Sequence, residues 1–233
     1  MKTAGLIGGV GWPSTLSYYR LLNGHVQSAL GGLHSARCII VSLDFAPVYS
    51  DMAAGNTVGA RAQMEAAARQ LRAAGVDLVA ILANTGHFAA DEVQAAAGVP
   101  LIHIAREAAA EVRLVSPSLR RLGLLTTSFA LDAPFFGRWL GQSGGLTLIK
   151  PDQGEQQALD AVIFGPLARG EASTEAAAEV AAMCGVLVQR GAEGILLGCT
   201  ELSHLLPLLS VSVPLFDSTD IHARAIVREM LHP

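Results

Sequence analysis

The stretch Gly191–Glu201, with the sequence GAEGILLGCTE, has the pattern of a buried strand that ends in reactive side chains. Ile195–Leu197 is a short apolar run, typical of a parallel strand covered on both faces of its sheet. Cys199, Thr200 and Glu201 follow at the carboxyl end of this predicted strand. Because ligands of open α/β sheets bind beyond the carboxyl ends of the strands, a thiol, a hydroxyl and a carboxylate in a row predict a functional site.

A similar pattern occurs earlier in the chain, in Gly75–Thr85, GVDLVAILANT. An offset of 116 residues (199 − 83 = 116) aligns Ala83 with Cys199. Two further pairs of apolar segments match at nearly this offset, namely Gly5–Gly9 with Gly123–Thr127 and Val99–Ile102 with Val213–Phe216. Apolar strands preceded by glycine recur by chance in α/β proteins, but three pairs in near register favour a duplicated α/β unit.

The composition indicates an ample apolar core and no surface for nucleic acid. The 233 residues are 51% hydrophobic and only 15% charged, enough for one large or two small domains. The net charge is −4, whereas nucleic-acid binding needs a basic patch, so the composition argues against a nucleic-acid-binding protein. We find no long apolar span and no signal-peptide pattern, so we expect a cytoplasmic protein without a membrane segment. Three cysteines at irregular spacing argue against a disulfide framework.

Apolar runs alternate with helical patterns along the whole chain. We expect strands at residues 4–7, 37–43, 77–82, 100–104, 122–125, 146–149, 195–197 and 213–216. We expect helices at residues 12–27, 57–74, 91–97, 134–140, 173–190 and 218–231, and a broken one at 156–168 that contains Gly165-Pro166. This alternation predicts an α/β fold with parallel sheets and helices on both faces.

Cys199 is the strongest candidate for chemistry, as a nucleophile or a proton carrier. Its place between Gly198 and Thr200 at a strand end favours function over simple burial as a small apolar side chain. Cys38 lies within a predicted strand and Cys184 within an alanine-rich helix, so we interpret both as core residues.

Uncharged polar side chains follow two other predicted strands. Asn84 and Thr85 follow one of them, and Thr126 and Thr127 follow the other. Together with backbone N–H groups at helix starts, such side chains could bind a carboxylate; the alternative is ordinary helix capping. His87, three residues after Asn84, could join this site through a hydrogen bond.

The sequence contains no pattern for a common cofactor or metal. The glycine-rich turn at Gly9–Ser14 lacks the third glycine of a dinucleotide fingerprint. The seven histidines form none of the usual metal-ligand spacings. The two lysines, Lys2 and Lys150, are not in a setting suited to a pyridoxal phosphate Schiff base. We therefore expect no cofactor and no metal.

Three motifs resemble the aspartate/glutamate racemase family, and together they cover nearly the whole chain. The opening is most similar to the branch of broad-specificity amino-acid racemases, and the Gly-Cys-Thr-Glu block is the most specific motif. The motifs are Gly8–Trp12 with Ser14, Thr15 and Tyr18–Arg20, then Asn84–His87, and then Gly198–Leu202.

The resemblance implies a cofactor-independent amino-acid racemase built from two similar αβα domains with mostly parallel sheets. The domains would be related by a pseudo-two-fold axis, with the active site in the cleft between them. It implies a first domain of residues 1–104 plus 212–233, a second of residues 105–211, and a homodimer. The substrate would be a small amino acid or dicarboxylate.

In this family one acid/base residue from each half acts on opposite faces of the substrate α-carbon, which implies Cys199 and the residue at position 83. A thiolate suits this task because its pKa can be tuned toward neutrality. The resemblance places the substrate against the remaining candidates: Val10, Asn84, Thr85, His87, Thr126, Thr127, Arg169, Thr200 and Glu201.

The chain departs from the family pattern at position 83. The family usually has cysteine there, or threonine in some members, and the side chain of Ala83 carries no transferable proton. Val10 replaces the commoner methionine, and the basic residue expected near position 168 is Ala168 or its neighbour Arg169. Ala83 fits an engineered variant that traps substrate, a natural one-cysteine enzyme like the decarboxylase relatives, or a binding protein without catalysis.

Overall fold

The computed structural model describes residues 1–232, which fall into two compact units. Unit 1 comprises Met1–His103 and the C-terminal residues from His222, and unit 2 comprises Ile104–Ile221. Each unit contains one four-stranded sheet in which every strand pairing is parallel, so the predicted α/β class is confirmed. Residues 212–221, expected in the first domain, belong to unit 2 because the strand at Leu215–Asp217 pairs within the second sheet.

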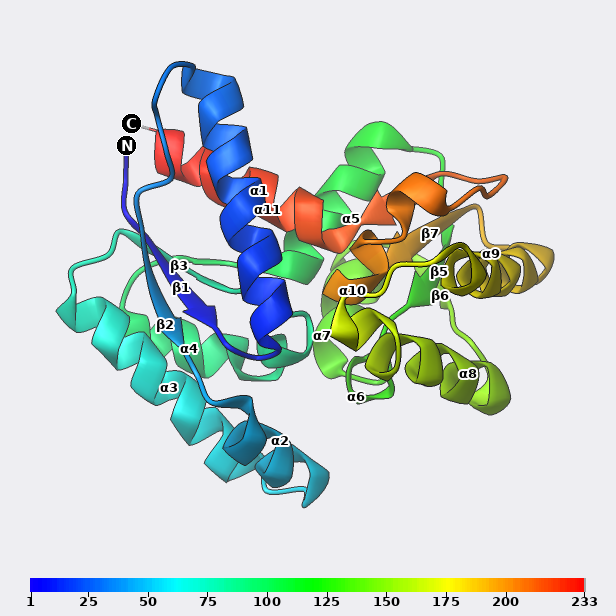
Figure 1. Cartoon of the computed structure of the whole chain (residues 1–233), viewed down its shortest axis with the longest axis horizontal. Coiled ribbons are helices and arrows are strands. Elements are labelled where there is room, and N and C mark those ends of the chain that lie inside the picture. Colours follow the sequence, from blue (N-terminus) through cyan, green and yellow to red (C-terminus); the bar gives the residue numbers. More distant parts are fainter. Residues whose placement is uncertain (233) are drawn as a thin grey trace. The chain divides into compact units, whose positions relative to one another are not determined.

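Unit 1 is organised around a sheet with the strand order β2-β1-β3-β4 (Figure 1). The strands are β1 (Ala4–Gly8), β2 (Cys38–Ser42), β3 (Leu78–Ile81) and β4 (Leu101–Ile102). The helices are α1 (Trp12–Leu30), α2 (Phe45–Ala53), α3 (Thr57–Ala73), the 3-10 turn η1 (Thr85–Ala89), α4 (Ala90–Ala97) and most of α11 (Ser218–Leu231).

Each face of this sheet has its own apolar core, because successive strand side chains point to opposite faces. Val79 and Ile81 of β3 pack with apolar residues of α3 and α4. Leu78 and Ala80, which alternate with these two along the strand, pack on the other face with α1 and α11. The continuous apolar run of β3 therefore reflects burial on both faces.

Unit 2 repeats the arrangement with the strand order β6-β5-β7-β8. The strands are β5 (Arg121–Leu125), β6 (Thr147–Ile149), β7 (Gly194–Leu197) and β8 (Leu215–Asp217). The α-helices are α5 (Ile104–Val115), α6 (Ser128–Leu131), α7 (Pro134–Phe136), α8 (Gln153–Phe164), α9 (Thr174–Gln189) and α10 (Thr200–Ser203). The π-helix η2 (Gly137–Ser143) and the 3-10 turns η3 (Leu167–Arg169) and η4 (Leu206–Leu208) complete it.

The second sheet is also covered on both faces. Leu196 of β7 packs with α5, α7 and η2, whereas Ile195 and Leu197 pack with α8 and α9. Figure 1 shows α8 and α9, in yellow-green and olive, beside the strands β5, β6 and β7. Two αβα units of the predicted kind are therefore present.

The duplication extends to single residues. Adding 116 to the bounds of β3 gives those of β7 (78 + 116 = 194 and 81 + 116 = 197). Ile81 pairs with β1, and Leu197 pairs with the corresponding strand β5. Ala83 and Cys199 each lie two residues beyond these strand ends, as the sequence offset predicted.

After the fourth strand of each sheet, the chain passes into the other unit, and the helix that follows belongs to that unit's core. Helix α5 follows β4, but its buried face belongs to the core of unit 2. Helix α11 follows β8, and from Ala223 onward its buried side chains belong to the core of unit 1. This reciprocal exchange explains why the unit boundaries lie at residues 103/104 and 221/222.

Several helices differ from the sequence-based expectations. Helices α2 and α5 were not predicted, and the helix expected over residues 134–140 is α7 continued by the π-helix η2. Pro47 is compatible with α2 because it lies in the first turn, where the backbone N–H has no helical partner. Across residues 1–232, no helix has both the length and the apolar character needed to cross a membrane.

Candidate active site

In unit 1, the carboxyl ends of β1 and β3 are neighbours at the point where the strand order reverses. Such a switch point is the usual ligand site of an open α/β sheet. The turn after β1 contains Gly9 at φ 81°, where an added Cβ would collide with the backbone of Leu43. The N–H of Gly9 donates to Thr15 Oγ1 at 2.9 Å, and Val10 shares a buried cluster with Ala83.

The residues after β3 form the other side of this switch point. Ala83 and Asn84 are buried, with exposed fractions of 5% and 4%. Thr85 is half-buried and begins η1, and His87 lies two residues later in the same turn. Ala83 occupies the position in unit 1 that corresponds to Cys199 in unit 2. Its methyl group can act neither as an acid nor as a base.

His87 supports the backbone of Ala83. Its Nδ1 lies 2.9 Å from the Ala83 carbonyl oxygen, and because a carbonyl only accepts, Nδ1 donates. Its ring centroid lies 4.7 Å from that of His103 and 5.6 Å from that of His222. Burial first, and then the neighbouring His222, lower the pKa of His87 from 6.5 to about 3. His87 is therefore a neutral side chain that positions the chain at residue 83.

This buried histidine predicts a loss of stability in acid. Because the pKa of His87 is lowered in the folded protein, the unfolded chain binds a proton that the folded chain rejects between about pH 6.5 and 3. Stability is complete above this window and falls by a few kcal/mol as the pH falls through it. The variant His87→Asn keeps an N–H donor near the Ala83 carbonyl and cannot titrate. Urea unfolding at about pH 7 and about pH 4 should therefore show a flatter pH dependence in the variant.

The control is His34→Asn, which makes the same change at an exposed loop residue. It should leave the wild-type pH dependence unaltered. An equal loss of stability in wild type and His87→Asn between the two pH values would assign the acid effect to other groups.

In unit 2, Thr126 and Thr127 follow β5 at the corresponding switch point. Thr126 is fully buried, and its hydroxyl donates to the carbonyl oxygen of Gly198 at 2.6 Å. Thr127 is 6% exposed, and its buried hydroxyl has no hydrogen-bond partner among residues 1–232. A buried hydroxyl without a partner is costly, so Thr127 Oγ1 is available to a ligand group.

Cys199 lies two residues beyond the end of β7 and is 5% exposed. Its Sγ donates a hydrogen bond to Glu201 Oε2, with a sulfur–oxygen distance of 2.9 Å. Burial raises the pKa of the Cys199 thiol well above its ordinary value, and the Glu201 carboxylate raises it further. The resting side chain is therefore a protonated thiol with a carboxylate as its immediate proton acceptor.

Two other predicted residues of unit 2, Thr200 and Arg169, differ in how directly they adjoin the Cys199 segment. Thr200 is 4% exposed and begins α10 directly after Cys199. Arg169 ends η3, which packs against α10. Its guanidinium is exposed and makes two hydrogen bonds of 3.0 Å with the Glu171 carboxylate. Arg169 is thus near the Cys199 segment in the fold but is already paired.

The remaining cysteines take no part in this arrangement. Cys184 is fully buried on the core-facing side of α9, and burial raises its pKa to about 11. Cys38 is half-buried in β2 against the core of unit 1. The core role predicted for Cys184 is confirmed. In the part of the chain that the structure describes, no group of three or more His, Cys, Asp or Glu side chains is arranged to hold a metal ion.

Sequence reasoning missed Gln156, which supports the Thr126 segment. Its Nε2 donates to the Thr126 carbonyl oxygen at 2.9 Å. Gln156 shares the buried face of α8 with Leu159, Val162 and Ile163. A polar residue at apolar spacing in a predicted helix was the available signal, but the spacing does not reveal which carbonyl the side chain reaches.

Comparison with known proteins matches this chain to one family over nearly its full length. The family described as Asp/Glu/hydantoin racemase matches residues 7–226. The broad-specificity amino-acid racemase RacX of Bacillus subtilis (strain 168) is 24% identical over 234 residues, which cover 97% of each protein.

Two crystal structures are similar over 100% of both chains. A candidate Asp/Glu racemase from Yersinia pestis has a TM-score of 0.89 and 36% sequence identity. An aspartate racemase homologue from Pyrococcus horikoshii OT3 has a TM-score of 0.84 and 30% identity. Since the family match includes both sheets and both switch points, this chain belongs to the Asp/Glu/hydantoin racemase family.

Proposed function

We propose that this protein is a cofactor-independent amino-acid racemase of the aspartate/glutamate type, in which Cys199 carries the α-proton. The observation that supports this most directly is the buried Cys199 thiol donating to Glu201 at the carboxyl end of β7. A general acid/base must lie within hydrogen-bond reach of its proton acceptor. Glu201 provides that acceptor for the thiol.

In the proposed reaction the Cys199 proton is first lost to solvent by way of Glu201, its hydrogen-bond acceptor, which leaves a thiolate. The thiolate then forms an S–H bond with the α-hydrogen of the substrate as the Cα–H bond breaks. The electron pair of that bond spreads into the substrate α-carboxylate, and return of a proton to the carbon completes the exchange. Because burial holds the thiol protonated at rest, ionisation of Cys199 is the step that the site has to assist.

The proposed binding group for the α-carboxylate consists of Thr127 and Thr200 of unit 2, and Asn84 of unit 1 is a separate candidate for the same role. Thr127 offers a buried hydroxyl that no residue among 1–232 engages, and Thr200 offers a buried hydroxyl next to Cys199. Asn84 is the equivalent of Thr200 at the 116-residue offset (200 − 84 = 116). Neutral donors of this kind bind a carboxylate without altering the charge of the thiol.

Ala83 limits the reactions that this chain can catalyse; the chain with Ala83 is the wild type of the comparisons below. A racemase of this kind needs a proton carrier on each face of the α-carbon, and alanine supplies none. The protein as it stands is therefore expected to exchange the α-proton of one enantiomer. The protonated resting state of Cys199 favours a second candidate function, a one-cysteine lyase such as a decarboxylase, in which the thiol only donates a proton to a carbanion.

The test is solvent-deuterium exchange at the α-carbon of L- and D-aspartate and of L- and D-glutamate, followed by proton NMR. A racemase limited by Ala83 exchanges one enantiomer. A lyase releases carbon dioxide from a malonate-type diacid and does not exchange amino acids. A protein that binds aspartate but does neither would contradict both functions. The resemblance also makes a homodimer the expected assembly, which sedimentation analysis would check.

The proposed binding group for the α-carboxylate predicts a loss of substrate affinity on removal of one hydroxyl. Thr127→Val keeps the shape of the side chain and should weaken aspartate binding by roughly 1–3 kcal/mol, the usual contribution of a hydrogen bond to a charged group. Its stability should change little, since Thr127 Oγ1 has no partner among the described residues in the free protein. Isothermal titration and thermal unfolding measure the two effects.

The matched control is Thr147→Val on the exposed side of the edge strand β6, which should bind aspartate as the parent does. If Thr127→Val also binds with unchanged affinity, the α-carboxylate is held elsewhere.

A further inference from the structure

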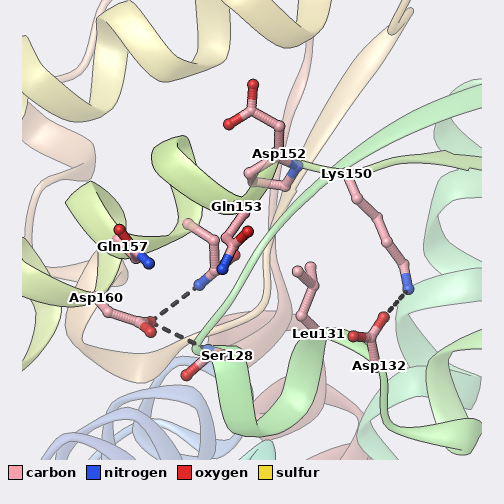
Figure 2. A pocket seen from close by; sticks show the side chains of 10 residues that line it. Ser128, Leu131, Asp132, Lys150, Asp152, Gln153, Gln157 and Asp160 are labelled. Carbon is pink, nitrogen blue, oxygen red and sulfur yellow. Dashed lines mark hydrogen bonds and ion pairs between the residues drawn. The ribbon is translucent and has the colours of Figure 1, made fainter.

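Unit 2 contains a pocket of about 530 Å³ that is lined neither by Cys199 nor by the threonines proposed to bind the α-carboxylate, although one of its lining residues, Gln156, also contacts the Thr126 segment. It lies between α8, the start of α6 and the loop after β6, and Figure 2 shows the side chains that line it. The volume lies within the range of small-molecule sites, roughly 300–1,000 Å³. Leu131 and Pro151 form its apolar part.

The charges in this pocket leave one carboxylate without a cation. Asp132 is paired with Lys150 at 2.8 Å, and Asp152 with Arg190 at 3.3 Å. Asp160 accepts hydrogen bonds from Gln156 Nε2 at 2.9 Å and from the Ser128 backbone N–H at 3.1 Å, both at its Oδ1 (Figure 2). Both donors are neutral. Within residues 1–232, no lysine or arginine forms an ion pair with Asp160, and its Oδ2 accepts no hydrogen bond.

Gln156 adds a second unmet acceptor beside Asp160. The side chain is 7% exposed, and its Oε1 accepts no hydrogen bond from the described residues. The orientation of the amide is well determined, because Nε2 faces two acceptors, the Thr126 carbonyl and Asp160. An enclosed amide oxygen without a donor is unfavourable, so an additional N–H donor beside Gln156 Oε1 and Asp160 Oδ2 would be stabilising.

We infer that this pocket binds the ammonium group of a small amine. The ammonium would donate to Asp160 Oδ2 and to Gln156 Oε1, two acceptors that no donor among residues 1–232 engages, while Gln156 Nε2 keeps its hydrogen bonds to Asp160 Oδ1 and the Thr126 carbonyl. The single uncompensated charge fits one ammonium, and Leu131 with Pro151 fits a short apolar body. This inference does not depend on the proposed racemase function.

The probe is isobutylamine, which is an ammonium ion at neutral pH, titrated into the full chain with ¹⁵N-labelled glutamine. We expect a saturable shift of the side-chain amide signals of Gln156, with an affinity in the millimolar range for so small a ligand. Isobutanol has the same shape without the charge and should shift these signals little. Equal binding of the alcohol, or no saturable shift with the amine, would overturn the inference.

The variant test is Asp160→Asn, which removes the charge and keeps the size. It should weaken isobutylamine binding by about tenfold or more, as expected for a charge-assisted hydrogen bond. The control Glu179→Gln changes the net charge equally on α9, outside this pocket, and should bind as the wild type does. If Asp160→Asn binds isobutylamine as tightly as Glu179→Gln does, the ammonium does not bind at Asp160 and the inference is wrong. Because the Gln156 titration uses the wild-type chain, a folding defect in the variant does not remove the test.

A second titration, with L-valine, distinguishes a free amino acid from a simple amine as the natural ligand. L-Valine differs from isobutylamine by an α-carboxylate. Tighter binding of valine at the Gln156 signals, weakened by Asp160→Asn, identifies free amino acids as the ligand class, and tighter binding of isobutylamine identifies simple amines. Either result supports the ammonium site, whereas a failure of both ligands to shift Gln156 contradicts it.

Discussion

Ala83→Cys is expected to give this chain exchange at both enantiomers of its substrate. The new thiol would lie at the carboxyl end of β3, in the register that Cys199 has at the end of β7. Acid/base catalysis by one positioned side chain contributes roughly 10²–10⁴-fold to a rate. Racemisation, which the chain with Ala83 is not expected to catalyse, should therefore appear in the variant, measured by loss of optical rotation and by deuterium incorporation into both L- and D-aspartate.

Two further variants make this test specific. Ala83→Ser adds a hydroxyl of similar size that is far less acidic than a thiol, and it should leave racemisation at the wild-type level. The double variant Ala83→Cys with Cys199→Ser should exchange the enantiomer opposite to the one that the wild type exchanges. A folded Ala83→Cys protein that binds aspartate but exchanges neither enantiomer would overturn the two-base assignment.

Cys199→Ser is expected to lower the wild-type exchange rate by roughly 10²–10⁴-fold. The serine hydroxyl can still donate to Glu201, so the fold should be retained, but it does not form an anion near neutral pH. Burial and Glu201 raise the pKa of Cys199, so wild-type exchange that needs the thiolate should increase with pH throughout the neutral and alkaline range. This rise should be absent in the serine variant.

The control is Cys38→Ser, which makes the same substitution at the half-buried cysteine of β2. It should keep both the exchange rate and its pH dependence. Unchanged turnover in Cys199→Ser would show that the α-proton is carried by another group.

Much of the architecture could be predicted from the sequence because it depends on short-range patterns. The apolar runs at β3 and β7 identify strands buried on both faces, and the glycines before them mark where the preceding helices end. The 116-residue offset aligned Ala83 with Cys199, and the two strand ends in the structure have that register. Helix α5 also carried a readable pattern, since its buried residues recur at helical spacing from Ile104 to Val112.

The unit boundaries needed the tertiary structure. Helix α5 continues directly from β4, and α11 from β8, yet each contributes its buried face to the core of the other unit. Sequence spacing shows that a helix is amphipathic but not which sheet covers its apolar face. That choice depends on packing between segments far apart in the chain.

The chemistry of the candidate site also depends partly on the sequence alone and partly on the tertiary structure. The sequence by itself determined that a thiol and a carboxylate two residues apart follow a buried strand, because that is a matter of order along the chain. Only the tertiary structure decided that Cys199 donates to Glu201, that His87 holds the Ala83 carbonyl, and that Gln156 joins Thr126 to Asp160. Hydrogen bonds and desolvation depend on distances of a few ångströms, and folding sets those distances between residues that the sequence keeps apart.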